Sequence, residues 1–233
     1  MKKHLFFAIP WWSCLCLLVM LSCGGGEKAN TDGENSAAFD SVKAPVYSGN
    51  TAVGVTHEVK DYAEWLKVYN NVSDPASRIS IYASPDDPNL ITVFALTKTH
   101  EDARNAFSSP EFKTVLATSG VTSEPVFNYY DIKFQAPGKT DKKYRLGVSH
   151  PVKDYAQWKR VFDEDEKIRT DAGLELRAIS TSADDPSMVH IMFATNDVDR
   201  AKDLIHSNDL KKRMAEGGVL AEPTLTVFKT PEN

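Results

Sequence analysis

The stretch THEVKDYAEW, residues 56–65, returns almost unchanged as SHPVKDYAQW, residues 149–158, which lies 93 positions further along the chain. Further identities follow in the same order, at an offset of 93 in the front half of each copy and of 98 from the Asp-Asp-Pro turns onward. An ordered series of this kind indicates a duplicated unit. The change of offset places five extra residues in the second copy, around IRTDAGLEL, residues 168–176.

Each copy repeats one order of predicted elements. In the first copy these are a strand at 51–57, a helix that Asp61 caps, strands at 78–84 and 90–96, a second helix interrupted at Ser109-Pro110, and a strand at 125–132. The second copy has strands at 144–150, 175–181, 188–194 and 223–229, with Asp154 as the helix cap. The order strand, helix, strand, strand, helix, strand predicts an α+β fold made of two tandem ferredoxin-like (βαββαβ) units.

The third strand of each copy, LITVFAL and MVHIMFA, is an almost continuous apolar run, which indicates burial on both of its sides. We therefore expect the two sheets to face each other and form an intrachain pseudo-dimeric α/β barrel. The predicted domains are a first ferredoxin-like unit at 51–134, a linker at 135–142 and a second unit at 143–230.

The N-terminus predicts a lipid anchor in the bacterial cell envelope. Two lysines and an apolar run form a signal peptide at residues 1–22, too short and too quickly followed by glycines to be a membrane span. Met20, Leu21 and Ser22 before Cys23 resemble the lipobox of bacterial lipoproteins, which implies acylation of Cys23 and contact with the membrane. An ordinary cleaved signal with an incidental cysteine is the alternative. Residues 23–50 are rich in Gly, Ser, Asn and charge and predict a lipidated flexible tether.

Charge and cysteine usage exclude several classes of function. Without the two lysines of the signal peptide, 25 basic and 32 acidic side chains remain, a formal net charge of −7, and no basic cluster is interleaved with aromatics. Nucleic-acid binding is therefore not expected. All three cysteines lie in residues 14–23, so the processed chain forms no internal disulfide.

Two pairs of equivalent residues are candidates for a ligand pocket. Trp65 and Trp158 occupy matching positions on the first helix of each copy, where each could stack on a ligand or simply fill the core. His57 and His150 close the first strands, where a histidine could carry a proton or instead fix the corner between strand and helix.

Two further candidates belong to the second copy alone. His190 interrupts an apolar strand where the first copy has Thr92, so it is either a hydrogen-bonded core residue or a residue that faces a cavity. Arg169 lies in the insertion and could bind a carboxylate or phenolate, or form a surface ion pair. No metal-spaced His or Cys cluster, Gly-rich phosphate loop or Gly-x-Ser-x-Gly motif is present, so we predict no metal and no cofactor.

The element order, the helical Asp-Tyr-x-x-Trp, the Asp-Asp-Pro turns and the SPEFK…GV and SNDLK…GV runs resemble the dimeric α/β barrel superfamily, which includes antibiotic-biosynthesis-monooxygenase-like domains. The resemblance implies a cavity between sheet and helices, which some members use for cofactor-free oxygenation, haem breakdown or isomerisation. It carries no catalytic residue over to this chain.

These observations predict an envelope-anchored lipoprotein whose tandem barrel binds a small apolar or aromatic ligand or a protein partner. The alternative is a cofactor-independent monooxygenase- or isomerase-like enzyme. Its pocket would lie in the second unit and be lined by four residues, His150, Trp158, Arg169 and His190.

Overall fold

The computed structural model describes residues 50–73 and 78–231, which all belong to one unit, Lys43–Asn233. The predicted signal peptide, Cys23 and the tether up to residue 49 lie outside the described residues. In the part of the chain that is described, no helix is both long and apolar enough to cross a membrane.

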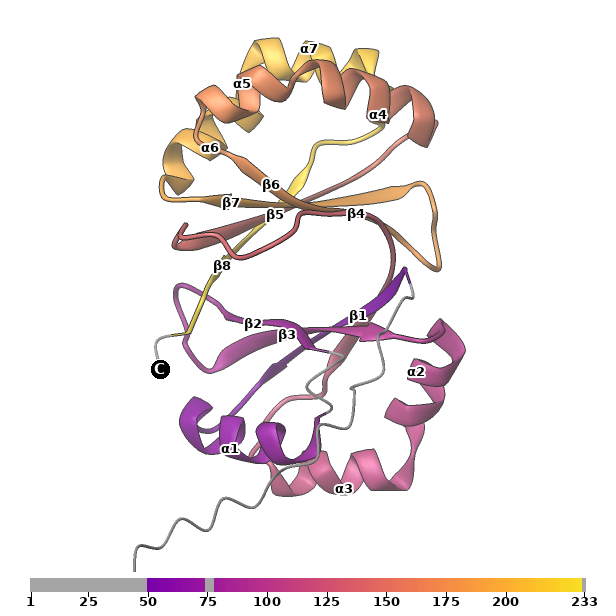
Figure 1. The fold of residues 1–233 in the computed structure, drawn as a ribbon, viewed down its shortest axis with the longest axis vertical. Helices are drawn as coiled ribbons and strands as arrows, with labels where there is room; N and C mark the ends of the chain where they lie inside the picture. Colours follow the sequence, from indigo (N-terminus) through magenta and orange to yellow (C-terminus); the bar gives the residue numbers. More distant parts are fainter. Residues whose placement is uncertain (1–49, 74–77, 232–233) are drawn as a thin grey trace, which may run out of the picture. The chain divides into compact units, whose positions relative to one another are not determined.

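The described elements follow the predicted order in both repeats, here the first repeat (51–134) and the second repeat (143–230) (Figure 1). The first contains β1 (Thr51–Glu58), α1 (Tyr62–Val72), β2 (Arg78–Ala83), β3 (Leu90–Thr97), α2 (His100–Ser108), α3 (Pro110–Thr118) and β4 (Val126–Gln135). The second contains β5 (Tyr144–Pro151), α4 (Tyr155–Glu164), α5 (Glu166–Asp171), β6 (Glu175–Ser182), β7 (Met188–Thr195), α6 (Val198–His206), α7 (Asn208–Glu216) and β8 (Thr224–Lys229). The predicted fold class, α+β with two tandem ferredoxin-like units, is confirmed.

Short polar side chains set the helix boundaries in the same way in both repeats. The Asp61 carboxylate accepts a hydrogen bond from the Glu64 backbone N–H at 2.9 Å, and Asp154 accepts from Gln157 at 2.7 Å. Caps of this kind stabilise a helix by about 1 kcal/mol each. Ser109 ends α2 and caps α3, with Pro110 at the first helical position, as the sequence predicts.

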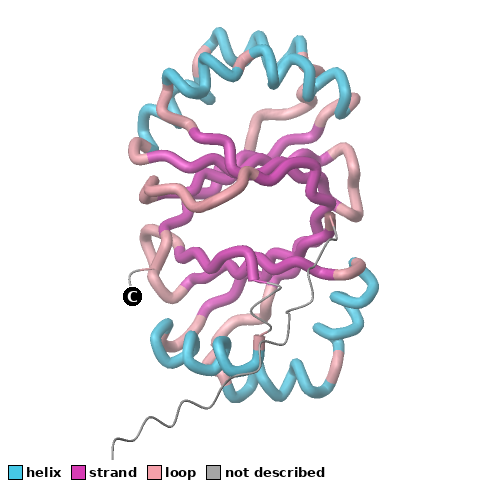
Figure 2. Tube along the Cα trace, viewed as in Figure 1, coloured by secondary structure: helices cyan, strands magenta, loops and turns pink. Residues whose placement is uncertain are grey.

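The strands of both repeats close into one antiparallel barrel in the order β1-β3-β2-β8-β5-β7-β6-β4 (Figure 2). Two seams join the repeats. At the first, β4 pairs with β6 from Tyr130 opposite Ser182 to Gln135 opposite Ala178. At the second, β2 meets β8 only where Ala83 lies opposite Lys229. The two seams therefore differ in length, with five paired positions between β4 and β6 and one between β2 and β8.

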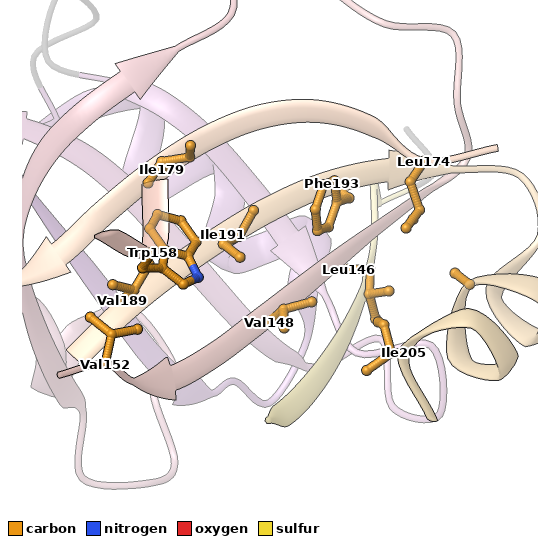
Figure 3. Close-up of a cluster of buried hydrophobic side chains, with 11 residues drawn as sticks. Leu146, Val148, Val152, Trp158, Leu174, Ile179, Val189, Ile191, Phe193 and Ile205 are labelled. Atoms are coloured by element: carbon orange, nitrogen blue, oxygen red, sulfur yellow. The ribbon is translucent and has the colours of Figure 1, made fainter. Parts of the chain in front are cut away.

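The main core lies between the outer face of the barrel and the helices. In the second repeat it gathers around Trp158 and includes Leu146, Val148, Val189, Ile191 and Phe193 (Figure 3). In the first repeat Trp65 occupies the equivalent place beside Ile91 and Val93. Because alternate residues of a strand point to opposite faces, the other half of each strand faces the barrel interior.

The insertion in the second repeat forms α5 and the turn after it. Gly173, at φ +78°, provides the left-handed residue with which α5 ends before the chain enters β6. Arg169 on α5 thereby comes to lie against α4.

Candidate functional site

The six candidate residues fall on two different faces of the sheet. His150, Trp158 and Arg169 line a small pocket between the sheet and the helices of the second repeat, and His57 and Trp65 occupy the equivalent place in the first. His190 lies on the opposite face and lines the barrel interior. The four second-repeat residues therefore do not share one pocket, because odd and even positions along β5 and β7 point in opposite directions.

His57 and His150 lie in nearly identical environments. Their rings lie 5.6 and 5.8 Å from those of Trp65 and Trp158, and their exposed fractions are 5% and 3%. None of their ring nitrogens has a hydrogen-bond partner among the described residues. Burial lowers the pKa of each imidazole to about 4, with a smaller contribution from His190 at His150. Both rings are therefore neutral at pH 7.

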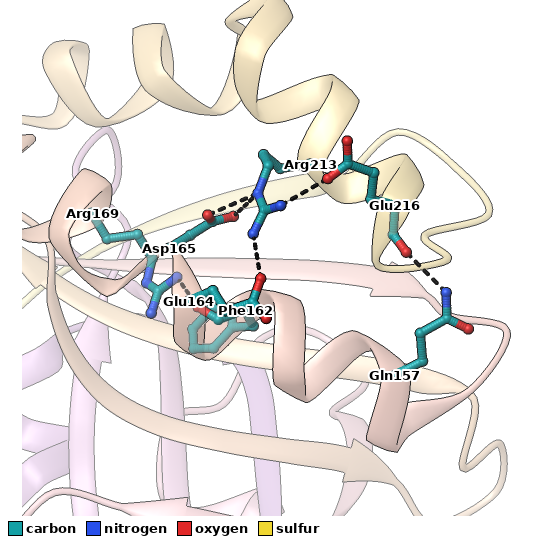
Figure 4. Close-up of polar contacts among 7 residues, drawn as sticks. All are labelled: Gln157, Phe162, Glu164, Asp165, Arg169, Arg213 and Glu216. Atoms are coloured by element: carbon teal, nitrogen blue, oxygen red, sulfur yellow. Dashed lines mark hydrogen bonds and ion pairs between the residues drawn. The ribbon is translucent and has the colours of Figure 1, made fainter.

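Arg169 lines the small pocket and is held by contacts within its own repeat. Its guanidinium lies 3.6 Å from the centre of the Phe162 ring and donates a hydrogen bond to the Phe162 carbonyl oxygen (Figure 4). Burial lowers the pKa of Arg169, and the carboxylates of Asp165, Asp163 and Glu166 partly oppose that shift. These contacts of Arg169 join α5 to α4.

Beside it, Arg213 on α7 bridges three carboxylates, those of Glu164, Asp165 and Glu216, at 2.8–2.9 Å (Figure 4). The pairs with Glu164 and Asp165 join the end of α4 and the residue before α5 to α7, and Asp165 and Arg213 line the helix-side pocket. The space left has a volume of about 60 Å³, far below the roughly 300–1,000 Å³ of sites for drug-sized molecules. The cavity between sheet and helices that the family resemblance implies is therefore present but nearly filled.

The barrel interior holds a much larger cavity, of about 600 Å³. Four aromatic rings line it in a connected cluster, with centres 5.8–6.3 Å apart. Three of the rings belong to the first repeat, Tyr82 on β2, Phe94 on β3 and Tyr130 on β4. The fourth, Phe228, belongs to β8 of the second repeat. Such rings offer a broad apolar surface for stacking.

His190 occupies one part of this cavity with both ring nitrogens hydrogen-bonded. Nδ1 lies 2.8 Å from the Ser149 hydroxyl and Nε2 lies 2.7 Å from the Ser182 hydroxyl. The Tyr130 ring packs edge-on against the imidazole at 5.1 Å. Burial lowers the pKa of His190 and raises that of Tyr130 to about 12, so both groups are neutral at pH 7. The two alternatives for His190 are both realised, since it is hydrogen-bonded and faces a cavity.

The first repeat builds a simpler version of the same arrangement. Thr56 and Thr92, the counterparts of Ser149 and His190, share a hydrogen bond of 2.9 Å. The two halves of the cavity are therefore chemically unequal, and the imidazole belongs to the second repeat.

The linker between the repeats lies along the cavity, and two arginines of the second repeat bond its backbone. Arg145 Nη1 donates to the Lys142 carbonyl at 2.8 Å, and Arg177 donates to the Gly138 carbonyl. Lys139 also lines the cavity. Sequence reasoning missed these residues and the four aromatic rings. The sequence did carry one signal for this cavity. Arg145 is a charged residue within the strand YRLGVSH, at the position where the first repeat has Ala52.

Within residues 50–73 and 78–231, no three His, Cys, Asp or Glu side chains gather where they could hold a metal ion. The cavity can therefore offer an incoming molecule aromatic faces, hydroxyls, a neutral imidazole and guanidinium groups.

Comparison with known proteins identifies the fold. No protein-family model and no curated protein sequence matches the chain. Among solved structures, a proposed monooxygenase from Lactobacillus acidophilus NCFM aligns over 76% of this chain and 92% of its own, with TM-score 0.51 and 9% identity. An anthrone oxidase-like protein aligns over 79% of this chain and 92% of its own, with TM-score 0.50 and 11% identity.

A ferredoxin-fold protein from Listeria monocytogenes 4b F2365, described as related to antibiotic biosynthesis monooxygenases, aligns over 80% of this chain and 98% of its own, with TM-score 0.47 and 8% identity. Together with the closed strand order, the two likenesses at 0.50 or above establish the fold. The chain therefore shares its fold with these two proteins, an α+β barrel of two ferredoxin-like halves, which is the fold that the sequence resemblance predicts. Likeness at this level of identity defines a fold and not an activity.

Proposed function

We propose that this protein binds a small, mainly aromatic or apolar molecule inside its barrel. The observation that carries the proposal is the cavity of about 600 Å³, which lies within the roughly 300–1,000 Å³ range of small-molecule sites. Its walls have the composition such sites share, apolar and aromatic surface with a few polar groups. The helix-side pocket of about 60 Å³ supports no comparable role.

Native mass spectrometry beside denaturing mass spectrometry tests this proposal directly. All described strands and core clusters lie in residues 50–231, so residues 24–233 keep every element that builds the barrel. We expect an excess mass of a few hundred daltons that denaturation releases. A bare polypeptide mass in both spectra, even from protein expressed in its native host, would argue against a small ligand and favour a protein partner.

A cavity-filling variant locates the bound molecule. Ser180 lines the cavity, and its counterpart in the first repeat is Tyr82. Ser180→Tyr therefore copies a side chain that the fold already accepts and places a ring opposite His190 in the strand register. We expect this variant to lose the excess mass, whereas Ser108→Tyr on the exposed face of α2 keeps it.

A second candidate function is that of a cofactor-independent monooxygenase- or isomerase-like enzyme. The observation in its favour is His190, a neutral titratable group that faces the cavity between two hydroxyls. Incubating the released compound with the protein in aerated buffer tests it. Conversion to a new mass or isomer that His190→Thr abolishes would support an enzyme, and recovery of the unchanged compound would leave binding as the function.

We propose in addition that acyl chains on Cys23 anchor the protein in the bacterial cell envelope. The support is the lipobox-like sequence before Cys23, together with the roughly 0.8 kcal/mol that each buried CH₂ contributes to membrane binding. The full-length protein should incorporate labelled palmitate and should sediment with membranes, and Cys23→Ser should prevent both. Equal labelling of the variant would refute acylation at this cysteine.

A further inference from the structure

The side chains that line the barrel cavity carry positive charge without negative charge. Among the described residues, three cationic side chains line it, Lys139, Arg145 and Arg177, and no aspartate or glutamate does. The chain as a whole has the opposite balance, with 32 acidic and 27 basic side chains. The charge of the cavity lining is therefore opposite in sign to the net charge of the protein, and the average composition does not explain this difference.

The positive charge of Arg177 is already balanced by an ion pair with a carboxylate. Its Nη1 pairs with the Glu175 carboxylate at 2.8 Å, and Glu175 also accepts a hydrogen bond from Thr140 at 2.7 Å. The Arg177 charge therefore has a partner at the cavity edge. Lys139 is exposed on the linker, where water solvates its ammonium group.

Arg145 differs from both, because it is buried and forms no ion pair with any of the described residues. Its exposed fraction is 9%. Nη1 donates to the carbonyl oxygens of Lys142 and Tyr144, at 2.8 and 3.1 Å, and no carboxylate of the described residues pairs with it. The Nε and Nη2 groups donate to none of the described residues. Arg145 Nε and Nη2 are not among the fully buried unpaired atoms, so they face the cavity, where an anionic ligand can pair with them. A charge that is largely removed from bulk water gains much from such a partner.

The surroundings of Arg145 show what kind of molecule would fit. Its guanidinium lies 5.8 Å from the ring of Tyr82, the first member of the aromatic cluster. Ring contacts continue from Tyr82 through Phe94 and Tyr130 to His190. One molecule can therefore lie along aromatic surface with a charged group at Arg145, and the neutral imidazole at the other end does not compete for that charge.

We propose that the molecule bound in the barrel is an aromatic or apolar acid whose single anionic group, a carboxylate, sulfonate or phenolate, pairs with Arg145. This inference rests on the proposed function, since it specifies the ligand class for the same cavity. Guanidinium and oxyanion groups form charge-assisted hydrogen bonds with paired geometry, which gives orientation as well as affinity. The first repeat has Ala52 at the equivalent position, so the cavity has one such anchor and the ligand has one orientation.

Two fluorescent probes of similar shape and different charge provide the test. 8-Anilinonaphthalene-1-sulfonate is an anion, and N-phenyl-1-naphthylamine is its neutral relative without the sulfonate. Residues 24–233 should bind the anion more tightly by about 10- to 100-fold, the range that a hydrogen bond to a charged group provides. Ser180→Tyr should lose both probes, which places them in the barrel.

Arg145→Ala copies Ala52 of the first repeat and should remove the preference for the sulfonate while the affinity for the neutral probe is kept. Arg145→Gln is the second variant, since its amide can still donate to the Lys142 carbonyl if the alanine variant does not fold. Arg160→Ala is the matched control, because Arg160 is exposed on α4 and lies outside the cavity. It should leave both affinities unchanged.

The outcomes separate this inference from the proposed function. If neither probe binds the wild type, or Ser180→Tyr retains both, the barrel is not a binding site and both proposals fail. If both probes bind the wild type equally, or both variants at position 145 keep the preference for the sulfonate, the cavity binds but Arg145 does not select an anion. Equal loss of both probes in the Arg145 variants would assign Arg145 a purely structural role.

Discussion

At the scale of single residues, the burial of His57 and His150 makes the free energy of unfolding depend on pH. The pKa of each imidazole is lowered by burial to about 4, against 6.5 for an exposed histidine. Between these values the unfolded chain binds protons that the folded chain does not. Stability is therefore complete above pH 6.5 and is lost as the pH falls toward 4, by up to about 3 kcal/mol for each histidine.

Replacing His57 with leucine should remove its share of this dependence. The ring nitrogens have no partner among the described residues, so His57→Leu leaves no described donor or acceptor unpaired, and the free energy of unfolding at pH 7 should be equal or higher. Urea unfolding between pH 4 and pH 7.5 measures the effect, as the difference between wild type and variant. His206→Leu, on an exposed helix end, should follow the wild-type profile. Matching profiles for His57→Leu and wild type would rule out this origin.

At the scale of elements, the sequence was enough to predict what is local. The order of helices and strands along the chain, the Asp61 and Asp154 caps and the break at Ser109-Pro110 depend on residues a few positions apart, and all are confirmed. Position in the sequence alone does not show which face of a strand a candidate residue occupies. His150 and Arg145 lie on the same strand, yet the first packs under the helices and the second enters the barrel.

The barrel expected from the duplication and the apolar third strands is confirmed, but the pairing at its seams is the part that local patterns could not give. Which strands meet at the seams depends on the relative placement of the two repeats, which no run of residues encodes. β4 continues into the linker and reaches Gln135, so it can pair with β6 along five positions. β8 ends at Lys229 and offers β2 only one. The two seams thus pair equivalent strands of the duplicated unit, but over different lengths.

This difference predicts unequal local stability of β2 and β6. Backbone amides with fewer ladder hydrogen bonds open more often. We expect the amides of β2 to exchange with deuterium at least about tenfold faster than those of β6, a difference of roughly 1.4 kcal/mol in opening free energy. Exchange followed by proteolysis and mass spectrometry measures both. β3 and β7 are each paired on two sides and serve as the matched control pair. Equal protection of β2 and β6 would mean that the narrow seam does not open.

At the scale of the barrel, the two repeats are arranged like the two subunits of a dimer, although they belong to one chain. Each contributes one part of the cavity wall, with Tyr82 and Phe94 from the first repeat and Phe228 and Arg145 from the second. Either repeat alone would expose this apolar face to water, and extended apolar surfaces of that kind associate. The linker is therefore expected to supply proximity rather than the interface itself.

Cutting the linker tests whether the interface alone holds the repeats together. A protease site inserted between Thr140 and Asp141 leaves both seams and the hydrogen bonds of Arg145 and Arg177 to the linker in place. The cut protein should elute as one species and give one mass in a native spectrum but two in a denaturing one. Its unfolding should become concentration-dependent, because the loss of the covalent link makes association bimolecular. Fragments that separate at micromolar concentration would show instead that the linker is essential, and that the seams are too weak for a two-chain barrel of this sequence.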